Sequence, residues 1–319
     1  MGDARSIDGF EELVEPFRRE LQLHCYRLLG SVHDAEDAVQ ETLVRAWRSL
    51  ARYEERGQLR AWLYRIATNR CLSMIEVRRR RELPMDLTPD TPSAEVAWLE
   101  PYPDSWLPAT PPGPEARYES REAVRLAFVA ALQWLPGRQR AALVLRDVLG
   151  MSARETAEVL EVSVAAANSA LQRARAAVAA VRDERGAEDP EAHRVAERYA
   201  AAWERGDVDA IVALLSADAR YAMPPVPEWY AGQDPIRAFL LRGPLTDRWR
   251  FVPALGNGQL GFGTYSWDGG RRDWVAVAVD LMSVRDGRIT EVLSFLGADH
   301  FPRFGLPLVL PGDEIPPGR

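Results

Sequence analysis

The sequence predicts a multidomain protein in which two all-α helical domains precede an α+β domain with a curved antiparallel sheet. Apolar residues spaced three and four apart run through residues 10–82 and 117–186, which is typical of helices that bury one face. From residue 190 to 302, two helices give way to alternating, strand-like segments joined by the turn sequences "NG", "DGG" and "RDG". Residues 83–116 are rich in proline and acid without a sustained period, which indicates a linker, and 303–319 are expected to form an irregular tail.

Composition narrows the class of protein. The chain has 319 residues, of which 47% are hydrophobic, so sizeable cores can form. It has no run of about 18 apolar residues and no basic-then-apolar start, so we expect a cytoplasmic protein without a membrane segment. Cys25, Cys71 and four scattered histidines offer no paired metal-ligand spacing, so neither a disulfide scaffold, a metal site nor a cofactor is expected. His24 is predicted to pack in a core.

The net charge of −7 is unevenly distributed along the chain. Residues 83–118 carry six acids and one arginine, and residues 187–319 carry 19 acids and 14 arginines. The helical parts are slightly basic, and every basic residue of the chain is arginine. The acidic total therefore does not exclude nucleic-acid binding by the helical parts.

A basic and aromatic helix is predicted over residues 59–81. Between Arg60 and Arg81 it holds seven arginines against the single acid Glu76, interleaved with Trp62 and Tyr64. Such a helix suits melted DNA, because bases stack on aromatic rings while guanidinium groups hold phosphates. The alternative is that Trp62 lies in the core and the arginines form a solvated face.

A helix-turn-helix is predicted within residues 115–186. Helices are expected over 119–135, 138–149 and 152–160, the last with a capping box of Ser152 and Glu155, followed by a short turn and a helix over 163–177. Asn168 and Gln172 share a face, where they can hydrogen-bond base edges. A stripe of Val164, Leu171 and Val178 is expected to dock on the domain. A helical hairpin with no role in DNA binding remains an alternative.

These elements together resemble the extracytoplasmic-function class of sigma-70-type factors, the subunits that direct bacterial RNA polymerase to promoters. "LLGSVHDAEDAVQETLVRAWRSL" is similar to the region-two helices that bind the polymerase clamp helices. "LRAWLYRIATNRCLSMIEVRRRR" is similar to the segment that opens and reads the minus-ten element. "LPGRQRAALVLRDVLGMSARETAEVLEVSVAAANSALQRARAAV" resembles region four, which reads the minus-35 element.

The resemblance implies core RNA polymerase, through its beta-prime clamp and beta flap, and promoter DNA as partners. The residues implied to face polymerase are Asp34, Glu36, Asp37, Gln40, Glu41 and Arg45. Those implied at the minus-ten DNA are Trp62, Arg65, Asn69, Arg70, Arg78, Arg79 and Arg80. Those implied at the minus-35 DNA are Ala165, Asn168, Ser169, Gln172, Arg173 and Arg175. Many relatives have glycine in the turn where this chain has Glu161, so that turn must avoid a positive φ or accept strain.

The C-terminal part is similar to SnoaL-like domains, a cone-shaped α+β fold shared with ketosteroid isomerases. "YAAAWERGDVDAIVALLSADARYAMPP" followed by "WYAGQDPIRAFL" carries this resemblance. In sigma factors such a domain implies internal regulation, through contact with the sigma domains in the same chain. The linker "WLEPYPDSWLP" is expected either to thread near the polymerase active-site and RNA-exit channel or to pack on the appended domain.

The leading hypothesis is therefore a promoter-specificity subunit with no catalytic residues, modulated in cis by the appended domain. Two alternatives concern that domain: it senses a small apolar ligand, or it is an enzyme. Residues considered for a pocket are Tyr221, Trp229, Tyr230, Trp267, Trp274, Asp280 and His300. A simple helix-turn-helix repressor would not account for the acidic helix and the basic, aromatic helix.

Overall fold

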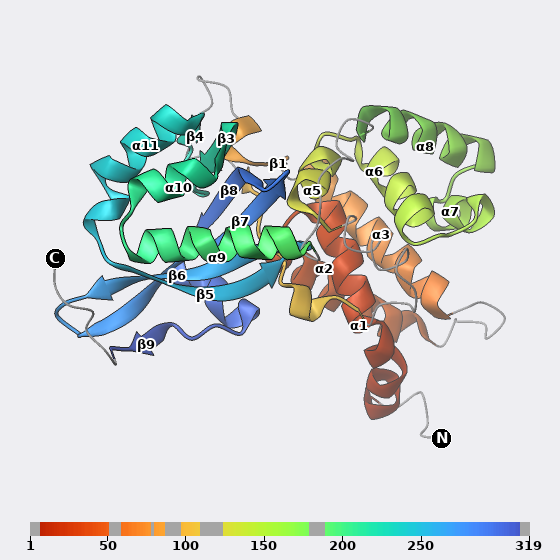
Figure 1. Cartoon of the computed structure of the whole chain (residues 1–319). Coiled ribbons are helices and arrows are strands. Elements are labelled where there is room, and N and C mark those ends of the chain that lie inside the picture. The colour runs from red at the N-terminus through yellow and green to blue at the C-terminus, as the bar shows by residue number, and fades with distance from the viewer. Residues whose placement is uncertain are drawn as a thin grey trace. The chain divides into compact units, whose positions relative to one another are not determined.

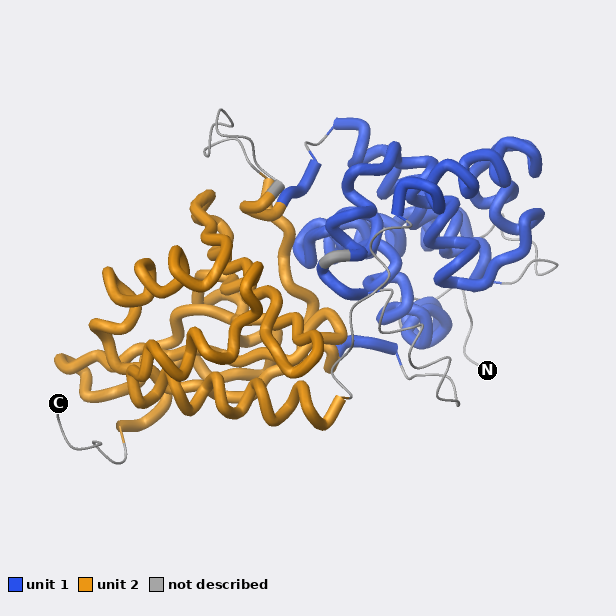
Figure 2. Tube along the Cα trace, turned by 45° about the horizontal axis from the view of Figure 1, so that its top comes forward, with its two compact units in different colours: residues 1–82, 106–182 blue, residues 83–105, 183–319 orange. Residues whose placement is uncertain are grey.

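A computed structural model describes residues 7–50, 59–77, 80–86, 97–108, 124–178 and 189–312. The chain folds into two compact units (Figure 2). Unit 1 comprises residues 1–82 and 106–182, and unit 2 comprises residues 83–105 and 183–319. No helix in the described ranges is long and apolar enough to cross a membrane.

Unit 1 is helical, and its N-terminal part is a three-helix bundle. Its helices are α1 (Ile7–Leu29), α2 (Val32–Ser49) and α3 (Leu59–Val77), followed by the two-residue strand β1 (Arg81–Glu82). The chain turns from α1 into α2 at Gly30, whose φ of 70° favours glycine, and Ser31 caps α2 by accepting a hydrogen bond from the Asp34 amide at 3.1 Å. The three helices pack on one another around fully buried apolar side chains.

The second part of unit 1 is also helical. It contains α5 (Leu126–Gln133), α6 (Gly137–Leu143), a π-helical turn (Val144–Val148), α7 (Ala153–Leu160) and α8 (Val164–Val178). The long helix expected over 138–149 is thus continuous but changes its hydrogen-bond pattern midway. The helix expected over 119–135 forms as α5 over Leu126–Gln133, and residues 119–123 of that prediction lie outside the described residues.

The two helical parts of unit 1 pack against each other. Helix α3 contacts both α6 and α7. A Cβ added to Gly137 would lie 3.1 Å from Leu72 Cδ2, so the start of α6 sits directly on α3. Arg140 of α6 is 4% exposed and donates hydrogen bonds to the backbone oxygen of Leu28 at the end of α1 and to Gln133 Oε1 at 2.7 Å. The region after the linker is therefore joined to the first bundle by buried contacts.

Unit 2 is an α+β domain whose sheet has the order β4-β3-β8-β7-β6-β5, with β9 paired to β7. Its helices are α9 (Pro190–Glu204), α10 (Val208–Leu214) and α11 (Gln233–Arg242). Its strands are β3 (Leu215–Ala222), β4 (Trp229–Ala231), β5 (Trp249–Gly256), β6 (Gln259–Asp268), β7 (Asp273–Arg285), β8 (Arg288–Leu296) and β9 (Val309–Pro311). Helix α9 packs against β5 to β8 (Figure 1).

The α+β prediction is confirmed, with two differences in detail. The sheet is antiparallel except for β3 and β8, which pair in parallel, an arrangement that the long connection between them in the chain permits. Part of the tail expected to be irregular forms β9, where Val309 pairs with Val275 of β7. This segment pairs through its backbone with the first residues of β7, and the proline-rich composition of the tail gave no sign of a strand.

Candidate nucleic-acid interface

The helix-turn-helix forms from local sequence signals. Ser152 Oγ accepts a hydrogen bond from the Glu155 amide at 3.2 Å, and Glu155 Oε2 accepts one from the Ser152 amide at 2.7 Å. This confirms the predicted capping box, and these bonds hold the pKa of Glu155 below its usual value. Helix α7 ends at Glu161, which has φ 53° and ψ 45°. The turn therefore holds Glu161, a residue with a Cβ, in the left-handed region. Of the two expectations for this turn, the one with a positive φ and some strain is correct.

Helix α8 presents a polar face to solvent. Ala165, Asn168, Gln172 and Arg173 are exposed, and Ser169 is half-buried. The opposite face consists of buried residues at helical spacing: Ala167, Ala170, Leu171, Ala174 and Val178. The predicted docking stripe is therefore correct for Leu171 and Val178 and wrong for Val164, which is 43% exposed and whose neighbours Ala165 and Ala166 at the start of α8 are also exposed.

The two arginines of this face have different surroundings. Arg173 donates to Ser169 Oγ at 3.1 Å on the same helix. Arg175 instead forms a two-bond ion pair with Asp147, at 2.8 Å from Nε and 2.6 Å from Nη2. That pair raises the pKa of Arg175 and holds its guanidinium against the π-helical turn. Arg173 is thus the freer of the two for a phosphate.

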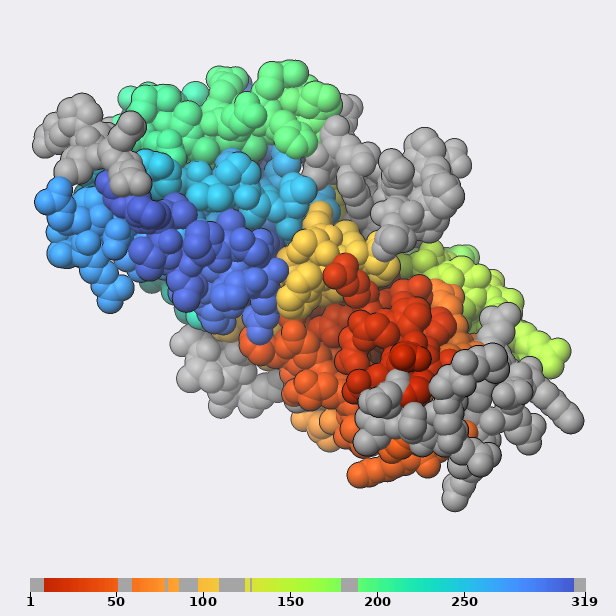
Figure 3. All heavy atoms as spheres, turned by 90° about the horizontal axis from the view of Figure 1, so that it is seen from below, coloured from red at the N-terminus to blue at the C-terminus, as the bar shows by residue number. Residues whose placement is uncertain are grey.

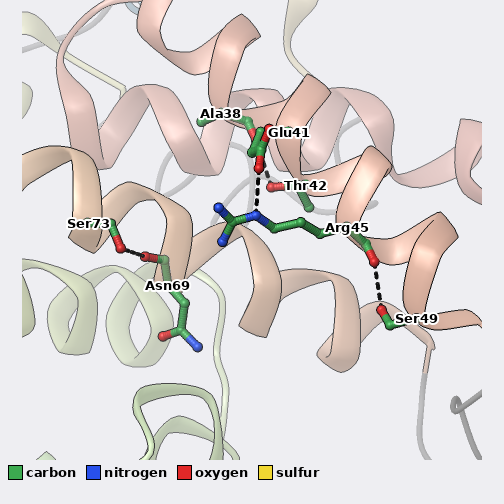
Figure 4. A network of polar contacts seen from close by, with 7 residues as sticks. All are labelled: Ala38, Glu41, Thr42, Arg45, Ser49, Asn69 and Ser73. Carbon is green, nitrogen blue, oxygen red and sulfur yellow. Dashed lines mark hydrogen bonds and ion pairs between the residues drawn. The ribbon is translucent and has the colours of Figure 1, made fainter.

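The basic helix predicted over 59–81 is α3, whose outer face brings three predicted residues together. Trp62, Arg65 and Asn69 are spaced three and four apart, so they lie on one face, and Arg65 is exposed. The Asn69 backbone oxygen accepts from Ser73 Oγ at 3.0 Å, while its side-chain amide projects away from Ser73 (Figure 4). Arg70, beside this face, is half-buried.

Helix α3 ends at Val77, so the prediction of a helix to residue 81 is wrong for Arg80 and Arg81, which lie outside the helix. Arg78 and Arg79 lie outside the described residues. Arg80 pairs with Glu82 at 2.6 Å, and its guanidinium lies 3.3 Å from the centre of the Trp134 ring. This arginine is therefore engaged within unit 1, so DNA would have to compete with two existing partners for it.

The residues predicted to face polymerase lie on α2 and have different exposures. Asp37, Gln40 and Arg45 are exposed, and Glu36 and Glu41 are half-buried. Glu41 accepts a hydrogen bond from Arg45 Nε at 2.7 Å (Figure 4), which holds the pKa of Glu41 below its usual value. Asp34 differs, because it is 7% exposed and forms an ion pair with Arg81 at 2.6 Å. Its side chain stabilises the bundle from within and is not part of the exposed face.

A segment of the linker packs on the strands of unit 2. Tyr102 is fully buried, its amide donates to Asn257 Oδ1 at 2.7 Å, and its carbonyl accepts from the Asn257 amide at 2.8 Å. The Gly258 amide donates to Asp104 Oδ1 at 2.9 Å, and Pro103 bridges to Gly256. Residues 97–105 are thus held at the β5–β6 turn, and Figure 3 shows them in yellow beside the blue part of the chain. This agrees with the expectation that the linker packs on the appended domain.

The candidate pocket of unit 2 differs in membership from the predicted set. Tyr221 and Asp280 line an apolar pocket in the domain. The other five predicted residues are not in its lining. Trp267 and Trp274 pack edge-to-face with ring centres 5.2 Å apart, and the ring of Tyr230 stacks on that of Phe239 with centres 4.4 Å apart. Trp229 is 39% exposed, and the ring centre of His300 lies 6.2 Å from that of Phe295.

Sequence reasoning missed four aromatic residues of the pocket. These are Trp203, Phe239, Trp249 and Phe251. The alternation of Trp249 and Phe251 on β5 was a usable signal, because residues two apart on a strand share a face. The position of Trp203 depends on how α9 lies across the sheet, which the sequence pattern does not specify.

The fold and these surfaces define a DNA-binding protein of the sigma-70 type with an appended α+β domain. Three family descriptions match the chain: Sigma-70 region 2 over residues 13–81, Sigma-70 region 4 over 125–178, and a SnoaL-like domain over 196–292. The first two cover the acidic helix, the basic helix and the helix-turn-helix, and the third covers most of unit 2.

Relatives extend this similarity along nearly the whole chain. The ECF RNA polymerase sigma factor SigG of Mycobacterium tuberculosis is 42% identical over 316 residues, which span 93% of this chain and 84% of SigG. SigJ of the same organism is 31% identical over 90% of this chain and 91% of its own. A crystal structure of SigJ matches with a TM-score of 0.61 and 28% identity, covering 95% of this chain and all of that one. The chain belongs to the extracytoplasmic-function sigma factors, with a SnoaL-like domain at its C-terminal end.

Membership in this family implies partners for the two sigma regions as a whole. Sigma regions 2 and 4 imply interaction with RNA polymerase and promoter DNA, and the chain acts in directing transcription initiation to promoters. The predicted sigma-factor function is confirmed at this level.

Proposed function

We propose that this sigma factor is regulated in cis by its SnoaL-like domain, which acts without catalysis by holding the linker between the two sigma regions. The observation that carries the proposal is the fastening of Tyr102 to Asn257 at the β5–β6 turn. Because the linker joins region 2 to region 4, anything that holds it limits how far these regions can separate.

The proposal assigns roles to the exposed residues of each surface. The outer face of α2, with Glu36, Asp37, Gln40, Glu41 and Arg45, binds the beta-prime clamp of core polymerase, and region 4 binds the beta flap. Trp62, Arg65 and Asn69 on α3 hold the melted minus-ten strand by stacking, phosphate contact and a base-edge hydrogen bond. The set on α8 that contacts minus-35 DNA is Ala165, Asn168, Ser169, Gln172 and Arg173.

The packing of unit 1 supports a form that is not engaged with a promoter. Helix α3 contacts α7, which in turn contacts α8. Each such helix-to-helix step is about 8–10 Å, so α3 and α8 lie within roughly 20 Å of each other. Positions −35 and −10 are about 25 base pairs apart, which is roughly 85 Å along straight duplex DNA. Simultaneous reading of both elements therefore requires the contact between α3 and α7 to break.

Arg140 is a main contributor to this closed packing. It is nearly fully buried and joins the end of α1 to α5 and α6, and its acceptors among the described residues are neutral oxygens. Burial without a carboxylate partner lowers the pKa of Arg140 to about 10. The hydrogen bonds of this guanidinium to several carbonyls exist only in this arrangement, whereas the desolvation that lowers its pKa opposes the arrangement, so opening exchanges the bonds for water at a modest net cost. Core polymerase would supply the free energy for opening.

The test uses full-length protein carrying Asn257→Gly, which removes the side-chain acceptor of the Tyr102 amide. The matched control is Asp286→Gly in the β7–β8 turn, where Asp286 also has a positive φ, of 51°. Promoter-dependent transcripts are measured with core polymerase on a library of promoter fragments, and affinity for promoter DNA is measured without polymerase. Release of the linker is expected to raise the polymerase-free DNA affinity at least about fivefold, the low end of losing one buried hydrogen bond.

The outcomes separate the two parts of the proposal. Transcripts that start at defined promoters with wild-type protein are expected from the sigma activity, and their absence with every variant would refute a promoter-directing role. Equal transcript yield, core affinity and DNA affinity for wild type, Asn257→Gly and Asp286→Gly would refute regulation through the linker while leaving the sigma activity intact.

A further inference from the structure

The pocket of the SnoaL-like domain combines aromatic walls with a single acid. Its cavity volume is about 190 Å³. Five aromatic side chains from α9, β3, α11 and β5 line it: Trp203, Tyr221, Phe239, Trp249 and Phe251. Aliphatic residues, Asp280 and the hydroxyl residues Thr264 and Ser294 complete the wall, and no arginine or histidine is among the lining residues. The pocket therefore presents several π-faces around very little polar surface.

Asp280 is the one ionisable carboxyl in this lining, and it is incompletely satisfied. It lies on β7, is 2% exposed, and is paired in register with Ser294 of β8. Its Oδ1 atom is buried and has no hydrogen-bond partner in the described part of the chain. The titratable groups that face it are the phenols of Tyr199 on α9 and Tyr221 on β3, and neither supplies a positive charge.

Burial also changes the titration of this carboxyl. Desolvation raises the pKa of Asp280 to about 7, and the hydrogen bond from Ser294 opposes that rise. Near neutral pH the pocket thus holds a carboxylate that is partly ionised and has no cation beside it. A buried charge in this position is costly unless a partner of opposite sign arrives.

We propose that this pocket binds a small organic cation, a protonated amine attached to an apolar group, whose N–H donates to Asp280 Oδ1. The ammonium group is attracted by the surrounding aromatic faces as well as by the carboxylate, and this combination is typical of sites for organic cations. The apolar group of the ligand fills the space between Phe239, Trp249 and Phe251, where it gains the free energy of leaving water. A neutral alcohol could donate to Oδ1 but would gain neither the ion pair nor the full cation–π attraction.

The exposure of the lining residues provides a path from solvent to the carboxylate. Trp203, Phe251 and Asp280 are buried, whereas Met223, Phe239 and Trp249 are half-buried. The pocket is formed within unit 2 alone, so binding does not depend on the sigma activity or on the linker contact.

The test compares 2-phenylethylamine with 2-phenylethanol by calorimetric titration of the full-length protein at about pH 8. The two probes have the same apolar group, and both can donate a hydrogen bond, but only the amine is charged. The amine is expected to bind at least about tenfold more tightly than the alcohol. Its affinity is expected to rise from about pH 6 to about pH 8 as Asp280 ionises, whereas that of the alcohol stays constant.

Three variants make the result specific to the pocket. Asp280→Asn keeps the shape but not the charge, and is expected to abolish the preference for the amine. Ala278→Leu narrows the cavity and is expected to weaken both probes. Asp218→Asn on β3 removes an exposed carboxylate of the same domain and is expected to change neither affinity. Thermal unfolding of each variant verifies that unit 2 is folded.

Several results would overturn the proposal. The alcohol binding as tightly as the amine would show a site for neutral ligands. Amine binding unchanged in Asp280→Asn would show that the carboxylate is not the partner. No binding of either probe at about 10 mM, a concentration well above the Kd expected for a specific site of this size, would remove the pocket as a ligand site.

Discussion

Replacing Asn257 by glycine is expected to release the amide of Tyr102 while preserving the turn that carries residue 257. Asn257 and Gly258 have φ values of 55° and 65°, the left-handed pair of a tight hairpin turn between β5 and β6. Glycine adopts this conformation at no steric cost, and the bond from the residue-257 amide to the Tyr102 carbonyl is retained. The substitution therefore removes one side-chain acceptor and little else from the backbone.

The magnitude follows from burial of the donor that is left behind. Tyr102 is fully buried, so its amide cannot turn to water while the linker stays in place. A buried donor without an acceptor costs roughly 1–3 kcal/mol. Because about 1.4 kcal/mol corresponds to a factor of ten, opening of this segment becomes roughly five- to 150-fold more frequent.

Hydrogen–deuterium exchange can measure this opening at one position. Tyr102 lies between Pro101 and Pro103, which have no amide hydrogen, so its signal is isolated in a short peptide. Exchange at Tyr102 is expected to accelerate by the factor above in Asn257→Gly and to stay unchanged in Asp286→Gly. A rate within about twofold of the wild type in Asn257→Gly, or equal acceleration in both variants, would refute the reasoning.

Three further perturbations test other parts of the structure. Glu161→Gly is expected to stabilise unit 1 by about 1 kcal/mol in calorimetry, because glycine adopts the left-handed conformation without steric strain. Glu158→Gly, within α7, is expected to destabilise unit 1 by about the same amount. Loss of stability in both variants would refute the strain at Glu161. Arg140→Ala is expected to destabilise unit 1 by at least about 2 kcal/mol, because it leaves the Leu28 carbonyl without its donor, and an unchanged transition would contradict that. Native Asp280 holds its proton more tightly than in the unfolded chain, so its contribution to stability is fully present below about pH 4 and is lost as pH rises through about 7. The free energy of unfolding of the wild type, measured against pH, should fall over this range. The same fall in Asp280→Asn would refute the assignment to Asp280.

Much of the fold was predictable because it depends on residues close together in sequence. The capping box at Ser152 and Glu155 involves positions three apart, and the turn sequences "NG", "DGG" and "RDG" mark the ends of the successive strands β5 to β8. The exposed face of α8 follows in the same way from helical spacing. Helix bounds near residues 124–126 and the π-helical turn were not predictable, since several patterns of hydrogen bonds fit the same apolar spacing.

The sequence by itself therefore determined the class of protein, the order of its domains and which faces of α2, α3 and α8 are polar. Only the tertiary structure decided which distant residues meet, because a contact across many residues depends on how whole elements pack. It removed Asp34 from the exposed acidic face by pairing it with Arg81, 47 residues away, and fastened Tyr102 to Asn257, 155 residues away. It also left Asp280 among aromatic rings from other elements, whose position no local pattern encodes.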